Sequence, residues 1–288
     1  MRLALGTVQF GLPYGIANRT GQVSREKALV MLHLARANGI DVLDTAIAYG
    51  NSEDCLGSIG VDGFRIVTKL PALPDICSDV RSWVRCELEA SMSRLGISAV
   101  YGLLLHRPDQ LLSSHGKTLY DVMQELKADG LVHKIGISIY SPHELESLTA
   151  GFALDLVQVP FNLIDRRIVD SGWLQRLKDS GVEIHTRSVF LQGLLLMSKG
   201  LRPSGFSQWA QLWERWDDWL SGSGISPLQA CLAFVLGFSG VDRVVVGADS
   251  VQQLQEILDA SSIVDIGVLP DLGCHDERLV NPSKWADL

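Results

Sequence analysis

The feature that most constrains this chain is an alternation of short apolar segments with longer amphipathic ones, repeated along nearly its whole length. Several of the short segments are rich in Val, Ile and Leu and show little alternation of polar and apolar residues. This pattern is typical of parallel strands that are covered on both faces. It predicts eight strands, at residues 2–7, 42–44, 65–69, 101–106, 133–138, 156–159, 182–186 and 243–246.

A segment with helical periodicity follows each predicted strand. Ser24 begins the first of these helices and Asn38-Gly39 ends it. The others are expected at residues 52–59, 78–95, 118–128, 142–149, 170–178, 227–238 and 251–260. Eight strand–helix units in 288 residues fit a closed (β/α)8 TIM barrel of the α/β class better than an open doubly wound sheet. No linker or shift in composition divides the chain, so we expect residues 1–288 to form one domain.

One interval is longer than this pattern requires. About 40 residues separate the seventh strand from the helix that begins at Pro227, far more than a usual strand–helix loop. They contain four tryptophans at spacings of four, three and three residues, which would put them on one face of an extra helix: Trp209, Trp213, Trp216 and Trp219. We favour core packing for this face. The alternative is a lid or substrate wall, because the segment follows a barrel strand at the end where sites form.

Composition narrows the classes of partner. The net charge is −8 and no basic tract occurs, which makes nucleic acid and anionic membranes poor partners. The five cysteines are odd in number and form no C-x-x-C pair, so we expect neither a disulfide framework nor a thiolate metal site. No signal peptide and no long uncharged apolar stretch is present. We therefore expect a cytoplasmic protein, either a monomer or a small homo-oligomer.

Polar residues stand at the carboxyl ends of three successive predicted strands. Asp44, Lys69 and His106 end strands that are otherwise apolar, and Tyr49 follows Asp44 after five residues. Each alone has a structural explanation, such as a helix cap, a lysine at the barrel rim, a core histidine or a loop aromatic. Together, at the end of a barrel where active sites form, they indicate a catalytic set.

Such a set suits proton transfer to a carbonyl oxygen. A phenol has a pKa near 10 and is a poor acid or base at neutral pH. We expect the Lys69 ammonium to lower the pKa of Tyr49 and Asp44 to hold the lysine. His106 would orient the carbonyl by hydrogen bonding or share in the proton transfer.

Seven motifs in order then resemble the aldo-keto reductase family, from Gly6 to about Glu256: LGTVQFG, GIDVLDTAIAYGNSEDCLG, IVTKL, LLLHRPD, GLVHKIGIS, VQVPFNLIDRR and VVVGADSVQQLQE. The resemblance implies that Asp44, Tyr49, Lys69 and His106 form a catalytic tetrad with Tyr49 as the general acid/base. It implies a reductase of aldehydes or ketones, or an alcohol dehydrogenase, that uses NADPH or, less often, NADH. The absence of a G-x-G-x-x-G turn agrees with a cofactor bound at the barrel mouth.

By the same resemblance, the cofactor contacts are expected from strand ends and from the turns after the first, seventh and eighth strands: Gly6, Thr7, Asp44, Ser138, Gln158, Arg187, Ser188, Val189, Phe190, Gln192, Gly193, Gly247, Asp249, Gln253 and Glu256. The family usually has Ser-Asn where this chain has Ser138-Ile139. Arg187 takes the place of a tyrosine that stacks on the nicotinamide, and a guanidinium can also stack on an aromatic plane. The structural alternative is that Arg187 points away and pairs with an acid.

Asp249 stands where many relatives have a basic residue for the 2′-phosphate. A carboxylate there repels a phosphate and can accept a ribose hydroxyl instead. NADPH is thus the cofactor that the resemblance implies, with NADH as the alternative.

Two functions remain open. The first is a reductase of a small-molecule carbonyl compound, for which Arg107, Arg187 and the tryptophan-rich helix would suit a sugar-like substrate. The second is a catalytically retired subunit of the same fold that senses a nucleotide or binds a partner. The complete tetrad favours the enzyme. No metal-binding motif occurs, and we expect no metal.

Overall fold

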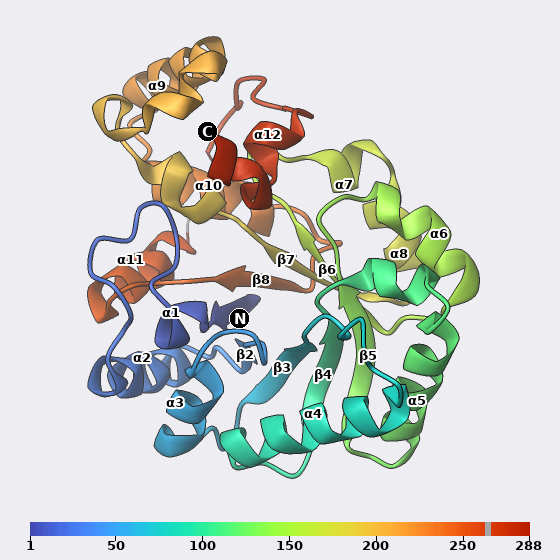
Figure 1. The fold of residues 1–288 in the computed structure, drawn as a ribbon. Helices are drawn as coiled ribbons and strands as arrows, with labels where there is room; N and C mark the ends of the chain where they lie inside the picture. The colour runs from blue at the N-terminus through green and yellow to red at the C-terminus, as the bar shows by residue number, and fades with distance from the viewer. Residues whose placement is uncertain (263–265) are drawn as a thin grey trace.

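Eight parallel strands close into a barrel in the computed structural model, which describes residues 1–262 and 266–288 (Figure 1). The strands follow one another around the barrel in chain order, and the first pairs with the last. They are β1 (Leu3–Gly6), β2 (Val42–Asp44), β3 (Arg65–Leu70), β4 (Val100–Leu105), β5 (Val132–Ser138), β6 (Leu156–Pro160), β7 (Glu183–Arg187) and β8 (Arg243–Val246). The predicted barrel is therefore confirmed, and its strands lie within two residues of their predicted bounds.

Two apolar layers hold the barrel together. One small cluster fills its interior, with one residue from each of six strands: Ala4, Val42, Val67, Leu104, Leu156 and Val245. A much larger cluster joins the outer faces of the strands to the surrounding helices. Because both faces of each strand are buried, the strands read as continuous apolar runs rather than as alternating ones.

The helices surround the barrel, and most lie where their periodicity predicts (Figure 1). They are α1 (Val8–Gly11), α2 (Arg25–Ala37), α3 (Ser52–Ile59), α4 (Val80–Leu95), α5 (Gly116–Ala128), α6 (His143–Gly151), α7 (Arg167–Asp170), α8 (Trp173–Asp179), α9 (Ala210–Ser223), α10 (Pro227–Leu236), α11 (Val251–Ala260) and α12 (Glu277–Val280). The helix predicted at residues 170–178 is α8, which begins three residues later than predicted, at Trp173. Gly172, with a φ of +75°, separates it from the short helix α7.

The insertion after β7 consists of the 3-10 helices Leu191–Leu196, Lys199–Leu201 and Ser204–Trp209, followed by α9. Trp213 and Trp216 of α9 are buried, and their indole N–H groups donate to the backbone carbonyls of Phe206 and Leu195 at 2.9 and 3.3 Å. Trp209 precedes the helix rather than belonging to it. None of the four tryptophans lines the cavity described below. The structure therefore bears out core packing for this face.

The C-terminal residues pack against the same insertion. The ring centroids of Phe206 and Trp285 are 4.9 Å apart, and Trp285 lies in the 3-10 helix Pro282–Asp287. Figure 1 shows the C-terminus beside α12 and α10.

Among the described residues, no single helix is long and apolar enough to cross a membrane. The segments Ser204–Ser223 and Pro227–Leu236 meet that test only when they are added together across a 98° bend.

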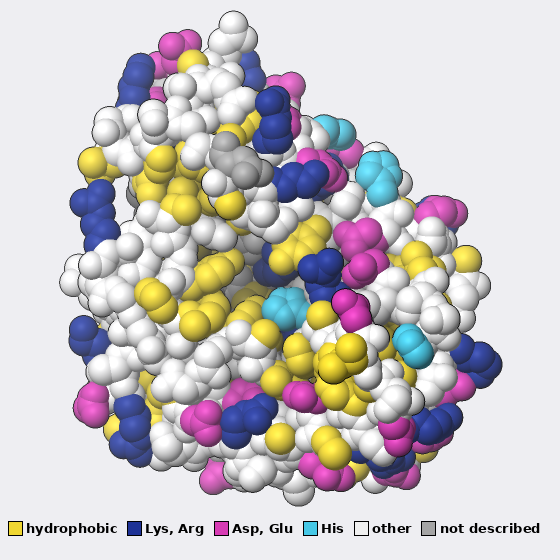
Figure 2. Space-filling model, viewed as in Figure 1, with side chains coloured by type: hydrophobic (Ala, Val, Ile, Leu, Met, Phe, Trp, Pro, Cys, Tyr) yellow, Lys and Arg dark blue, Asp and Glu magenta, His cyan; other side chains and the backbone are white. Residues whose placement is uncertain are grey.

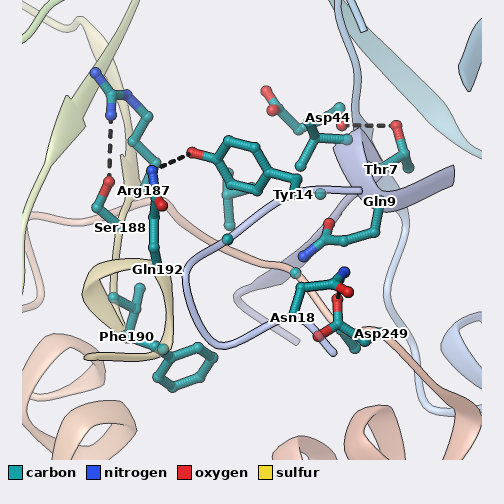
Figure 3. Close-up of a pocket in the computed structure, with 18 of the residues that line it drawn as sticks. Thr7, Gln9, Tyr14, Asn18, Asp44, Arg187, Ser188, Phe190, Gln192 and Asp249 are labelled. Carbon is teal, nitrogen blue, oxygen red and sulfur yellow. Dashed lines mark hydrogen bonds between the residues drawn. The ribbon is translucent and has the colours of Figure 1, made fainter. Parts of the chain in front are cut away.

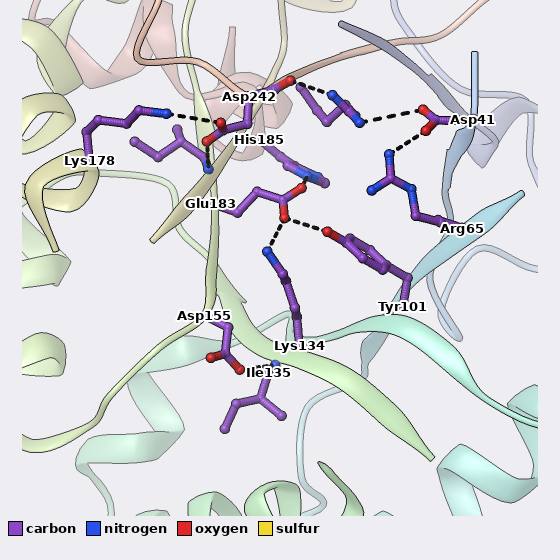
Figure 4. A network of polar contacts seen from close by, with 12 residues as sticks. Asp41, Arg65, Tyr101, Lys134, Ile135, Asp155, Lys178, Glu183, His185 and Asp242 are labelled. Carbon is purple, nitrogen blue, oxygen red and sulfur yellow. Dashed lines mark hydrogen bonds and ion pairs between the residues drawn. The ribbon is translucent and has the colours of Figure 1, made fainter. Parts of the chain in front are cut away.

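A network of charged groups closes the barrel at the amino ends of its strands (Figure 4). Glu183 accepts hydrogen bonds from Tyr101 Oη and His185 Nε2, each at 2.7 Å, and pairs with Lys134. Burial alone would raise the pKa of Glu183, but the bonds from His185, Lys134 and Tyr101 more than offset this and hold the pKa well below its usual range. The Glu183 carboxylate thus links side chains from β4, β5 and β7 at the end of the barrel away from the mouth.

We predict that Glu183→Gln lowers the free energy of unfolding by about 2–4 kcal/mol at pH 7, because it leaves the Lys134 ammonium without its counter-ion. A group whose pKa is depressed by folding stabilises the protein above its unfolded pKa and loses this contribution as the pH falls. The difference between wild type and variant should therefore shrink at a pH below about 4. Urea unfolding at both pH values measures it.

Glu125→Gln is the matched control. Glu125 pairs with Arg81 and Arg85 on the surface, where solvent weakens ion pairs, so its replacement should change stability far less. Equal losses for the two variants would contradict the structural role of Glu183.

Candidate active site

A cavity of about 500 Å³ opens at the carboxyl ends of the barrel strands. Figure 2 shows a hollow near the centre of one face, with apolar side chains and a histidine along its edge. Three of the four residues of the predicted tetrad line the cavity, and the fourth, Lys69, is buried behind it. All the residues expected to bind a cofactor line it as well: Gly6, Thr7, Asp44, Ser138, Gln158, Arg187, Ser188, Val189, Phe190, Gln192, Gly193, Gly247, Asp249, Gln253 and Glu256.

A buried ion pair lies at the base of this cavity. Lys69 Nζ donates to Asp44 Oδ1 and to the backbone carbonyl of Thr45, both at 2.8 Å, and the lysine is fully buried. The other carboxylate oxygen, Asp44 Oδ2, accepts from Gln158 Nε2 at 2.6 Å. Burial lowers the pKa of Lys69, and the charge and hydrogen bond of Asp44 act against this effect. The pair is therefore satisfied on both sides, as a buried pair must be.

Tyr49 and His106 lie next to the pair. Lys69 Nζ is 5.1 Å from the centroid of the Tyr49 ring, and the Tyr49 and His106 rings meet edge to face at 5.8 Å. Close backbone packing fixes the turn that carries Tyr49. A Cβ atom on Gly11 would lie 1.8 Å from the Tyr49 carbonyl oxygen, so only glycine allows α1 to approach this turn.

The structure corrects one expectation about Tyr49. Burial raises the pKa of the Tyr49 phenol, the negative charge of Asp44 raises it further, and Arg187 acts in the opposite direction. Burial and Asp44 outweigh the Lys69 ammonium, whose charge is partly offset by Asp44 at 2.8 Å. Tyr49 is therefore held in its protonated form, which is the form that donates a proton.

His106 is neutral at physiological pH. Burial lowers its pKa to about 4, and the positive charges of Lys69 and Arg187 add to the effect. A neutral imidazole in this position can donate or accept one hydrogen bond at each ring nitrogen.

Arg187 marks one end of the cavity. Its guanidinium stacks on the Tyr140 ring at 4.6 Å and donates to the Ile139 carbonyl at 2.9 Å and to Ser188 Oγ at 3.2 Å. It lines the cavity and forms no ion pair with any acid in the described part of the chain, so the alternative in which it points away to an acid is wrong.

Asp249 marks the other end. Its carboxylate accepts from Asn18 Nδ2 at 3.1 Å (Figure 3), and its backbone N–H donates to Gln253 Oε1 at 2.7 Å. Burial raises the pKa of Asp249. Ser250 caps α11 by accepting from the Gln253 N–H, which leaves the start of this helix facing the cavity with its remaining N–H groups.

Several cavity residues have no counterpart in the sequence-based expectations, and three of them carry polar side chains from one segment: Gln9, Tyr14 and Asn18. They belong to α1 and to the loop between α1 and α2, which crosses the cavity and meets Gln192 through Tyr14 Oη at 3.3 Å (Figure 3). The sequence signal for this loop is limited to a turn at Asn18–Gly21. Asn18 Oδ1 accepts from the N–H groups of Thr20 and Gly21, the turn that an Asn–x–x–Gly sequence favours.

The described residues contain no group of three or more His, Cys, Asp or Glu side chains that could hold a metal ion.

Comparison with known proteins places the chain in a family. A model of the aldo/keto reductase family matches residues 2–266. The oxidoreductase sirO of Leptosphaeria maculans is 27% identical over 89% of this chain and 87% of its own length. The NADH-specific methylglyoxal reductase of Escherichia coli is 24% identical over 91% and 90%, and the D-threo-aldose 1-dehydrogenase of a Pseudomonas species is 27% identical over 88% and 89%.

Solved structures share the fold. The holo form of an aldo-keto reductase from Bacillus halodurans superposes with a TM-score of 0.73 at 19% identity, covering 92% of this chain and 88% of that one. A glycerol dehydrogenase from Gluconobacter oxydans gives a TM-score of 0.69 at 22% identity, covering 94% and 88%.

We predict that His106 titrates near pH 4 and remains neutral from about pH 6 upward. Arg187→Gln should raise this pKa, because it removes one of the three positive charges that oppose protonation, those of Lys69, Arg187 and Arg107. Imidazole nitrogen shifts, followed by NMR as the pH is varied, measure both. A His106 pKa of 6.5 or above in the wild type would contradict the electrostatics described here.

Proposed function

Because the chain belongs to the aldo/keto reductase family, we propose that it is an oxidoreductase that transfers hydride between a nicotinamide dinucleotide and a small aldehyde or ketone. The observation that carries the proposal is the buried Asp44–Lys69 pair beside Tyr49 and His106 at the base of the cavity. In the reductive direction Tyr49 is the general acid for the carbonyl oxygen, and in the reverse direction it is the base.

The residues of the cavity fit a dinucleotide. Gln9 Oε1 is a buried acceptor without a partner in the structure, and it lies beside Gly247, where a Cβ atom would come within 2.5 Å of Gln9 Nε2. A buried oxygen that accepts no hydrogen bond, next to a glycine that leaves no room for a side chain, is typical of a place where a ligand approaches the backbone. The bound dinucleotide would supply the hydride.

Each residue of the tetrad then has a role that follows from its surroundings. Tyr49 is held protonated by burial and by Asp44. Lys69 is fixed by Asp44 and Thr45, and it places a positive charge beside the phenol where negative charge develops as the proton leaves. His106, neutral at physiological pH, would donate a hydrogen bond that orients the substrate carbonyl.

Some residues would hold the nicotinamide end, namely Ser138, Gln158 and Arg187. Ser138 Oγ donates to Gln158 Oε1 at 3.2 Å, and Gln158 in turn donates to Asp44, so the amide that would meet the cofactor is fixed in orientation by the tetrad itself. The residues after β7 and at the start of α11 would hold the rest of the dinucleotide.

The proposal extends to cofactor choice. Asp249 has the place that a basic residue occupies in many relatives, and its carboxylate is fixed by Asn18. A fixed carboxylate disfavours a 2′-phosphate and suits a ribose hydroxyl. A relative that is 24% identical is described as NADH-specific. We expect NADH to serve about as well as NADPH, although NADPH is the usual cofactor that the family resemblance implies.

The remaining expectations concern the whole protein. The substrate is a small carbonyl compound, and residues 1–288 act as one cytoplasmic domain, as a monomer or small homo-oligomer. The idea of a sugar-like substrate loses part of its basis, because neither Arg107 nor the tryptophans line the cavity; Arg107 faces Asp109 instead.

We predict that the wild type oxidises NADH or NADPH when a carbonyl substrate from a panel of aldehydes, ketones and sugars is present. Tyr49→Phe should lower kcat by about 10²–10⁴-fold with little change in dinucleotide affinity, because it removes the proton donor and keeps the ring. Steady-state kinetics and fluorescence titration of the dinucleotide measure the two effects. No turnover across the panel, with tight dinucleotide binding, would instead support the retired, nucleotide-sensing subunit.

We predict kcat/KM values for NADH and NADPH that lie within about tenfold of each other. Asp249→Ser should raise kcat/KM for NADPH by about tenfold, because it removes one like charge near the 2′-phosphate. The control is Asp259→Asn, which removes an acid from the exposed side of α11 outside the cavity. Wild-type protein that binds NADPH alone would refute the role of Asp249.

A further inference from the structure

We infer that Arg187, besides lying at the nicotinamide end of the cavity, binds an anionic group of the substrate with its free N–H groups, so that the carbonyl compound taken by this site carries a carboxylate. The inference rests on the proposed function, because it names the substrate class of the same site. It depends on how charge is distributed in the cavity.

The catalytic end of the cavity has one positive charge that nothing offsets. Lys69 and Asp44 form an ion pair at 2.8 Å, and the His106 ring is neutral at pH 7. Arg187 is then the remaining charged group of that end, and no described acid pairs with it.

Apart from Asp44, which pairs with Lys69, the negative side chains of the cavity lie elsewhere. Asp249 and Glu256 belong to the turn after β8 and to α11. Figure 3 shows Arg187 and Asp249 on opposite sides of the pocket. The cavity is therefore polarised: the cation without an acidic partner lies near the tetrad, and the carboxylates without a basic partner lie away from it.

Three other arginines that are withdrawn from solvent have counter-ions, whereas the half-buried Arg2 and Arg166 donate to backbone carbonyls and form no ion pair among the described residues. Arg94 donates two hydrogen bonds to Glu53, Arg167 pairs with Asp165, and Arg202 pairs with Asp217. A half-buried guanidinium without such a partner is costly to desolvate. An anionic ligand would supply the counter-ion that the protein does not.

The guanidinium is also held in place for binding. Tyr140 stacks on it, and the Ile139 carbonyl and Ser188 Oγ each accept one N–H. A guanidinium has five N–H donors, so donors remain for a ligand. Because the group is planar and pre-oriented, it suits the two oxygens of a carboxylate.

The anchor lies within electrostatic reach of the reacting groups. All three residues line the cavity, and the charge of Arg187 acts to lower the pKa of Tyr49 and of His106. A substrate whose carbonyl meets Tyr49 and whose carboxylate meets Arg187 would therefore be held at two points, which restricts its orientation.

Two rigid aldehydes of equal shape test the inference by kinetics. 4-Carboxybenzaldehyde and 4-formylbenzamide differ in charge at the group opposite the aldehyde. In the corresponding pair, 3-carboxybenzaldehyde and 3-formylbenzamide, this group lies closer to the aldehyde. We expect kcat/KM for the acid to exceed that for the amide by about tenfold or more in at least one pair. Arg187→Gln should bring this ratio to about one, and Arg187→Lys should retain part of it because the charge remains. The ratio is insensitive to a change in cofactor affinity, since both aldehydes meet the same cofactor complex.

Arg107→Gln is the matched control. Arg107 also follows a barrel strand, but it is exposed, faces Asp109 and does not line the cavity, so its loss should leave the ratio as in wild type.

Binding without turnover provides the second readout. Calorimetry on the protein with saturating dinucleotide should show benzoate binding about tenfold tighter than benzamide, with a difference that falls as salt is added and disappears in Arg187→Gln.

The outcomes separate the two proposals. Tighter binding of benzoate without turnover of any aldehyde would refute the reductase and keep the anion site. Turnover of acid and amide at equal rates, with equal binding of benzoate and benzamide, would refute the anion site and keep the reductase. A preference that survives Arg187→Gln or is lost in Arg107→Gln would also overturn the assignment to Arg187.

Discussion

The buried pair of Asp44 and Lys69 is the interaction around which the mouth of this barrel is arranged. A fully buried ammonium persists only with a partner, and Asp44, from the neighbouring strand, provides it at 2.8 Å. The same carboxylate receives Gln158 from the opposite side of the barrel, and the Thr45 carbonyl completes the lysine's contacts. Because these bonds cross the barrel interior, they fix the positions of the strand ends that surround the cavity.

The pair also sets the electrostatics of its neighbours. Since Asp44 neutralises Lys69, the phenol of Tyr49 feels burial and the carboxylate more than it feels an ammonium, and its pKa rises. Burial, Lys69 and Arg187 together keep His106 neutral. The result is a cavity base with a protonated phenol, a neutral imidazole and, at one side, a free guanidinium. The opposite end of the barrel has its own charged network around Glu183, which closes the interior away from the cavity (Figure 4).

The barrel could be predicted from the sequence because its strands are buried on both faces and therefore appear as apolar runs. The grouping of Asp44, Tyr49 and His106 followed from their places at or just after strand ends, which the barrel brings to one rim. The position of the loop with Tyr14 and Asn18 over the cavity could not be predicted. Its contacts are with Gln192 and Asp249, which are 178 and 231 residues away in the sequence, and such contacts leave no periodic pattern. The raised pKa of Tyr49 could not be predicted either, because it depends first on how deeply the phenol is buried and then on the charge of Asp44.

The measurement that tests this account most directly is the pH dependence of the reduction step in a single turnover, with enzyme and reduced dinucleotide mixed rapidly with an aldehyde. Because burial and Asp44 raise the pKa of Tyr49, the phenol stays protonated at neutral pH, and the account predicts a rate that is constant from about pH 6 to about pH 8. A rate that falls about tenfold per pH unit within that range, and that becomes flat in Tyr49→Phe, would show that the phenol ionises near neutrality and would contradict it.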